Sequence, residues 1–116
     1  MAQFLWLVLT NPAQGAEQEF NRWYDEEHVP DMLGVDGVAA VQRFQFVTSG
    51  GLPEPAQRYL AVYEVEAESP EEVMASFQKA LSEPGRIRIS QALDRESLQW
   101  HFRPIGPRVS GRAAGD

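Results

Sequence analysis

The chain has 116 residues, a formal net charge of -7 and no cysteine. With 43% hydrophobic and 23% charged residues, its composition is that of one globular domain rather than a disordered chain. The lack of cysteine excludes disulfides, thiolate nucleophiles and cysteine-ligated metal centres. The acidic balance argues against a nucleic-acid partner and against a basic membrane anchor.

The first apolar run, from Phe4 to Leu9, ends at Asn11-Pro12. Apolar residues occupy both of its alternating positions, which predicts a strand buried on two faces. The run is much shorter than the roughly 20 residues of a membrane span. It has no basic residue before it and no small-residue cleavage site after it, so it is not interpreted as a signal peptide. We therefore expect a cytoplasmic protein that does not bind membranes.

A helix is predicted over residues 16–28. Its aromatic side chains recur on one side at three- and four-residue steps, at Phe20, Trp23 and Tyr24. Pro30 is expected to end it, because the residue before a proline avoids the helical region. The glycines at 34 and 37 then predict a turn.

Two strands are predicted next, over 38–47 and 58–66, with a loop over 48–55 that suits a hairpin tip or a flap. Simple alternation places the following residues on one face of the earlier strand: Val38, Ala40, Gln42, Phe44 and Phe46.

Ser69 and Pro70, followed by acidic residues, predict the start of a second helix, which Pro84-Gly85 ends. Residues 86–93 are ambiguous between a short helix and a loop. Residues 97–103 predict the last strand, and the chain from Pro104 onward is typical of an arm or a frayed tail.

This order of elements predicts an α+β, ferredoxin-like βαββαβ domain over residues 1–103, with both helices on one face of a four-stranded antiparallel sheet. Residues 104–116 form the predicted arm. Two helices cover only one face, yet the strands are apolar on both. We therefore expect a second copy to cover the other face in a homodimer.

His28 lies in the densest cluster of polar and aromatic residues, and its ordinary pKa is near neutrality. At the end of the predicted helix, the helix dipole would favour its protonated form. Asp25 and Tyr24 precede it by three and four residues, so either could orient it as a general base. The alternative is that His28 only caps the helix and pairs with Asp25.

Other candidates have structural alternatives as well. His101 could line a pocket or a subunit seam, or simply pack. Arg43 could clamp a carboxylate or enolate, or form a surface ion pair. Tyr59 and Tyr63 could donate phenol hydrogen bonds into a pocket or to structural partners. Phosphate-loop, dinucleotide, HExxH and GxSxG motifs do not occur, and the histidine spacing does not predict a metal site.

The pattern Trp23-Tyr24-x-x-x-His28-x-Pro30, followed by Gly34-Val35-Asp36-Gly37-Val38 and Arg43-Phe44, resembles the EthD-like branch of the dimeric α/β-barrel superfamily. The resemblance implies a two-fold dimer with an apolar pocket between sheet and helices in each subunit. It also implies that His28 faces that pocket. Many relatives have a proline before the glycine where this chain has Asp36, and residues 84–92 match no motif of the family.

The superfamily includes cofactor-free monooxygenases of aromatic polyketides, polyketide cyclases, muconolactone isomerases and haem-binding proteins. The resemblance implies a cofactor-independent enzyme acting on an aromatic or polyketide-like molecule, with His28, Asp25 and Tyr24 as catalytic candidates. An accessory protein that binds an apolar molecule for an oxygenase, and a haem-binding member, are the alternatives. The candidates for contact with the substrate are Trp6, Trp23, Arg43, Tyr63 and His101.

Overall fold

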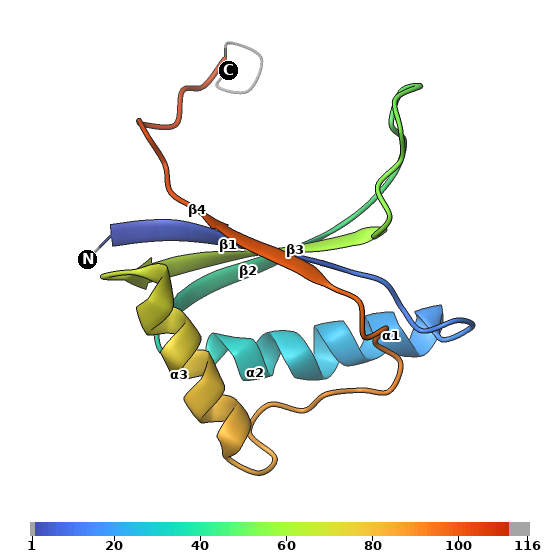
Figure 1. Ribbon diagram of the computed structural model, residues 1–116, viewed down its shortest axis with the longest axis horizontal. Helices are drawn as coiled ribbons and strands as arrows, with labels where there is room; N and C mark the ends of the chain where they lie inside the picture. The colour runs from blue at the N-terminus through green and yellow to red at the C-terminus, as the bar shows by residue number, and fades with distance from the viewer. Residues whose placement is uncertain (1, 112–116) are drawn as a thin grey trace.

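The computed structural model describes residues 2–111 and has one four-stranded sheet with helices on one face (Figure 1). Its elements are β1 (Ala2–Thr10), α1 (Glu17–Trp23), η1 (Tyr24–His28), α2 (Val29–Leu33), β2 (Val38–Gln45), β3 (Tyr59–Ala67), α3 (Pro70–Ser82) and β4 (Leu98–Phe102). The strands run in the order β2-β3-β1-β4, and each neighbouring pair is antiparallel. The predicted α+β, ferredoxin-like fold is confirmed.

The core lies between the sheet and the helices. Alternate residues of the central strand β3 are buried there, from Tyr59 to Ala67. The register places Tyr63 of β3 opposite Trp6 of β1, and Trp6 opposite His101 of β4. A row of aromatic side chains therefore crosses the helix-covered face of the sheet.

The first helix continues through Pro30, so the prediction that this proline ends it is wrong. α1 passes into the π-helical turn η1 and then into α2, which ends at Leu33. At the end of η1, the backbone N–H of Val29 donates to the carbonyl oxygen of Tyr24, five residues earlier. This wider turn accommodates the proline ring, which would press on the carbonyl four residues earlier in a regular α-helix.

A β-bulge in β2 corrects the predicted pattern of faces. Val38 pairs with Val65 and Ala40 with Glu64, so Ala39 is an extra residue in this strand. Val38 consequently shares the helix-covered face with Val41, Arg43 and Gln45, whereas Ala40, Gln42 and Phe44 lie on the other face. Simple alternation failed here because a bulge inserts one residue without a partner.

The second helix begins as predicted. The Ser69 side chain accepts a hydrogen bond from the backbone N–H of Glu72, and Pro70 occupies the first turn. Val73 and Ala80 bury one face of α3. Residues 83–97, which include the ambiguous stretch 86–93, form an irregular segment that runs beneath the first helix before β4 (Figure 1).

Two irregular segments extend on the side of the sheet opposite the helices (Figure 1). They are the β2–β3 connection, residues 46–58, and the described part of the tail, residues 103–111. Each carries exposed apolar side chains, such as Leu52 and Ile105. Residues 112–116 of the predicted arm lie outside the described residues. Among the helices of residues 2–111, none is both long and apolar enough to cross a membrane.

Candidate functional site

His28 is buried against two aromatic rings on the π-helical turn. Its ring stacks on Trp23 with centroids 4.7 Å apart and meets Tyr24 edge-on at 5.0 Å. Its Nδ1 atom is buried and has no hydrogen-bond partner among residues 2–111. π-Helical turns often occur at functional sites. A buried polar atom without a partner destabilises the fold, and a catalytic role is one explanation for keeping it.

The environment keeps the His28 imidazole neutral. Burial is the main cause that lowers its pKa to about 4. The negative charge of Asp31 acts in the opposite direction, and the positive charge of Arg43 lowers the pKa further. The helix continues beyond His28, so the expected dipole stabilisation of a protonated ring is not the deciding effect. At neutral pH the ring can accept a proton.

Asp25 contacts Arg43 rather than His28, contrary to the predicted orienting role. Its Oδ1 accepts a hydrogen bond from Nη1 of Arg43 at 2.8 Å, and its side chain is 64% exposed. Asp25 and His28 both belong to the π-helical turn η1, so the three-residue spacing of a regular α-helix does not apply. Tyr24, the other predicted partner, touches His28 through its ring.

The hydroxyl groups of Tyr24 and Tyr63 lie 3.1 Å apart in the core. Burial raises the pKa of Tyr24, and burial raises the pKa of Tyr63 well above its ordinary value. Both phenols are therefore protonated at neutral pH. One hydroxyl proton forms the bond between them, which leaves the other for a ligand oxygen.

Arg43 lies over the face of the Tyr24 ring, with Cζ 4.4 Å from the ring centroid. Its Nη1 donates to Asp25 and its Nη2 donates to Oδ1 of Asn21 at 2.7 Å. The guanidinium is thus a fixed positive charge next to the tyrosine pair.

Trp6 connects the tyrosine pair to His101. The Trp6 ring lies 5.0 Å from Tyr63 and stacks on His101 at 5.5 Å, while its Nε1 donates to Gln99. Nε2 of His101 is a second buried nitrogen without a partner in the described chain. Burial lowers the pKa of His101, so this ring is also neutral at pH 7.

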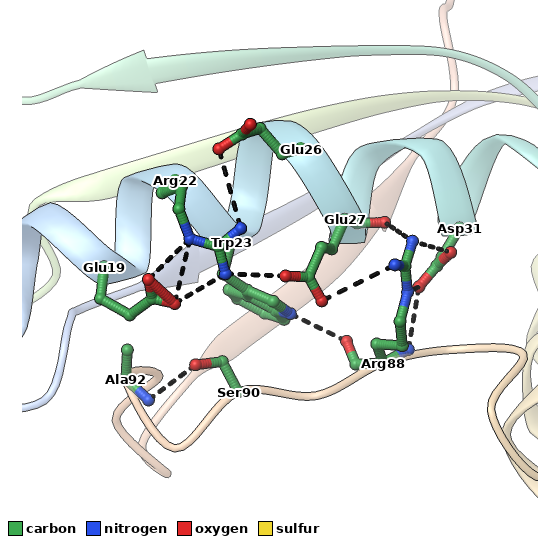
Figure 2. A network of polar contacts seen from close by, with 9 residues as sticks. All are labelled: Glu19, Arg22, Trp23, Glu26, Glu27, Asp31, Arg88, Ser90 and Ala92. Carbon is green, nitrogen blue, oxygen red and sulfur yellow. Dashed lines mark hydrogen bonds and ion pairs between the residues drawn. The ribbon is translucent and has the colours of Figure 1, made fainter.

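The irregular segment 83–97 runs along the first helix beside Trp23, and Figure 2 shows its residues Arg88, Ser90 and Ala92 there. Nε1 of Trp23 donates to the carbonyl oxygen of Arg88 at 2.9 Å. The Arg88 side chain donates to both carboxylate oxygens of Asp31, at 3.0 and 2.9 Å, and this pairing lowers the pKa of Asp31. The segment therefore fixes the indole on which His28 stacks.

Direct contacts link all eight predicted site residues: Trp6, Trp23, Tyr24, His28, Arg43 and Tyr63, with Asp25 bound to Arg43 and His101 stacked on Trp6. The rings of Trp23 and Tyr24 pack against His28, which is 9% exposed. No group of three or more ionisable side chains in the described part of the chain is arranged to hold a metal ion.

Sequence reasoning missed two contributors. Asn21 lies one helical turn before Asp25, and that spacing was a usable signal for a shared partner such as Arg43. Arg88 lies in a segment without periodicity, and no sequence pattern indicated that it would contact Asp31.

The comparisons with known proteins establish the fold. No protein-family model and no curated protein matches the chain. Solved structures that match include an EthD-family protein from Bacillus halodurans C-125, with 17% identity over 90% of this chain and 100% of that chain and a TM-score of 0.56. An EthD-like protein from Ralstonia eutropha JMP134 has 15% identity over 93% and 97%, with a TM-score of 0.61.

A third match is a putative monooxygenase from Shewanella loihica PV-4, with 18% identity over 91% of this chain and 97% of that chain and a TM-score of 0.55. The predicted resemblance to EthD-like proteins is therefore confirmed as a likeness of fold. Identities this low carry no residue roles, because one fold hosts many reactions.

Proposed function

We propose that this protein is a cofactor-independent enzyme that moves a proton at a carbon next to a carbonyl group of an aromatic or polyketide-like molecule. The observation that carries the proposal is the buried, neutral His28 whose Nδ1 has no partner among residues 2–111. The surrounding rings of Trp23 and Tyr24 suit an aromatic ligand.

In the proposed reaction, Nδ1 of His28 accepts the proton and the C–H electron pair moves into the carbonyl to form an enolate. The free hydroxyl proton of the Tyr24–Tyr63 pair donates to the enolate oxygen. The imidazolium then returns its proton at the same or another carbon, which completes an exchange, isomerisation or cyclisation. The low pKa of free His28 rises in this step, because the enolate stabilises the neighbouring imidazolium.

A second function, binding without catalysis, has one observation in its favour. With a pKa of about 4, His28 is a weak base until an anion forms beside it. An accessory protein that holds an aromatic molecule for an oxygenase needs the apolar surroundings of His28 but not its basicity.

Proton exchange in D₂O separates the two functions. The purified protein is incubated with a panel of aromatic ketones and 1,3-diketones, and NMR follows the loss of the α-proton signal. Enzymatic proton transfer predicts exchange well above the buffer rate for at least one compound. Tight binding without exchange supports the accessory function, and a panel that is neither bound nor exchanged contradicts both.

We also propose that the protein is a homodimer in which the sheets face each other. The sheet face opposite the helices carries a contiguous set of apolar side chains on neighbouring strands, among them Leu5, Phe44, Leu98, Trp100 and Phe102. Trp100 is 48% exposed and Phe102 is 52% exposed in the single chain. A second copy of the chain would cover this face with the same apolar surface, as in a two-fold homodimer.

Leu98→Glu is expected to convert the dimer to a monomer, because it places a charge within the buried contact. Sedimentation velocity at micromolar concentration measures the change. Leu33→Glu is the matched control, since Leu33 is an equally exposed leucine on the helix side. A wild-type protein that sediments as a monomer at these concentrations, or equal behaviour of the two variants, contradicts the proposed dimer.

A further inference from the structure

A surface pocket of about 540 Å³ lies between α1 and the edge of the sheet formed by β2 and β3. Its polar lining consists of Glu17, Asn21, Asp25, Arg43, Gln45 and Tyr59. Arg43 also stacks on Tyr24, so this pocket adjoins the buried tyrosine pair. The pocket is open to solvent, whereas His28 is not.

The Tyr59 hydroxyl has a donor proton that the fold does not use. Nδ2 of Asn21 donates to this oxygen at 3.3 Å, and Nε2 of Gln45 donates to it at 3.4 Å. Two accepted hydrogen bonds occupy both lone pairs, and residues 2–111 supply no acceptor for the hydroxyl proton. Since Tyr59 is buried and lines the pocket, a ligand oxygen in the pocket is a natural acceptor.

Arg43 offers further donors in the same pocket. Only two of its five N–H groups have partners in the described chain, one on Asp25 and one on Asn21. The Arg43 side chain is 15% exposed, whereas that of Asp25 is 64% exposed. An ion pair with one partner largely in solvent contributes little, so another carboxylate can take the place of Asp25. A free carboxylate can also bind the guanidinium with both oxygens.

We propose that this pocket binds the carboxylate of an aromatic acid, with Arg43 and Tyr59 as donors and with Asp25 as an internal carboxylate that the ligand displaces. Glu17 and Asp25 are both negative, so the ligand binds well only when Asp25 leaves Arg43. The inference rests on the proposed function and names a chemical class for its substrate.

The test compares 2-naphthoate with its neutral amide, 2-naphthamide, by NMR titration of the ¹⁵N-labelled protein. We expect 2-naphthoate to shift the side-chain amide signals of Asn21 and Gln45 and the Nε signal of Arg43. We expect it to bind at least tenfold more tightly than the amide. Tyr59→Phe, which removes the unused proton, is expected to weaken naphthoate binding about fivefold.

Asp25→Asn is the decisive variant, because it removes the competing carboxylate. We expect it to strengthen naphthoate binding about three- to fivefold. Glu26→Gln is the matched control: it removes the same charge one residue along the helix, where Glu26 pairs with Arg22 instead. Thermal unfolding verifies that both variants are folded.

Equal affinities for the acid and the amide would overturn the inference, and so would equal effects of Asp25→Asn and Glu26→Gln. Binding needs no turnover, so the two proposals fail separately. Naphthoate binding without any proton exchange contradicts the enzyme alone. Proton exchange on neutral ketones with no preference for the acid contradicts the carboxylate pocket alone.

Discussion

His28→Gln is expected to lower kcat for proton exchange by about 10²–10⁴-fold, the usual contribution of a positioned general base. Glutamine keeps a polar side chain of similar length but cannot accept a proton from carbon at neutral pH. KM is expected to change much less, because the Trp23 and Tyr24 rings beside His28 remain. The measurement is the exchange rate in D₂O on the compound that the wild-type protein exchanges fastest.

His101→Gln is the matched control for this prediction. His101 also carries a buried nitrogen without a partner in residues 2–111, but it lies on the far side of Trp6 from the tyrosine pair. Its substitution is expected to leave kcat within about tenfold of wild type. A His28→Gln variant that keeps more than about a tenth of the wild-type kcat would remove His28 from the reaction.

The free energy of unfolding is expected to fall by roughly 3 kcal/mol as the pH is lowered from 6.5 to 4, because of His28 alone. The pKa of His28 is about 4 in the folded chain, against an ordinary value of 6.5. The unfolded chain therefore binds the proton first, and stability rises with pH across this window. Well above pH 6.5 this residue is neutral in both states, and the effect disappears.

Urea unfolding at several pH values, for the wild-type protein and for His28→Gln, isolates this contribution. Other groups also lose stability in acid, such as Asp31, whose pairing with Arg88 lowers its pKa. These groups are common to both proteins, so the difference between the two curves reports His28. Parallel curves between pH 4 and 6.5 would mean that the imidazole is not buried in a neutral form.

Much of the fold could be predicted from sequence because its signals are local. Alternation predicted β3, and the sequence of Ser69, Pro70 and acidic residues predicted the start of α3, which the structure confirms. Pro30 and the faces of β2 were predicted wrongly, since a π-helical turn and a β-bulge each change the repeat by one residue. Neither irregularity leaves a pattern in composition or periodicity.

The part of the candidate site that lies on a single helix could be predicted from the sequence, because helical spacing determines which of its side chains are neighbours. Trp23, Tyr24 and His28 come from a single helix, and the structure does bring their rings together. The partner of Asp25 could not be predicted, because Arg43 reaches it from another element. The contact of Arg88 with Asp31 spans 57 positions of the sequence, and only tertiary packing specifies it.

The bulge at Ala39 has a consequence for how related chains are aligned. Ala39 is exposed and stands outside the ladder of pairs, so losing it would leave every later pair of β2 and β3 unchanged. Val38 and Arg43 would both keep their orientation in a chain one residue shorter. A relative without the bulge would have one residue fewer between Gly37-Val38 and Arg43-Phe44. An alignment with that relative therefore needs a gap of one position here, because otherwise one of the two motifs is aligned with the wrong residues.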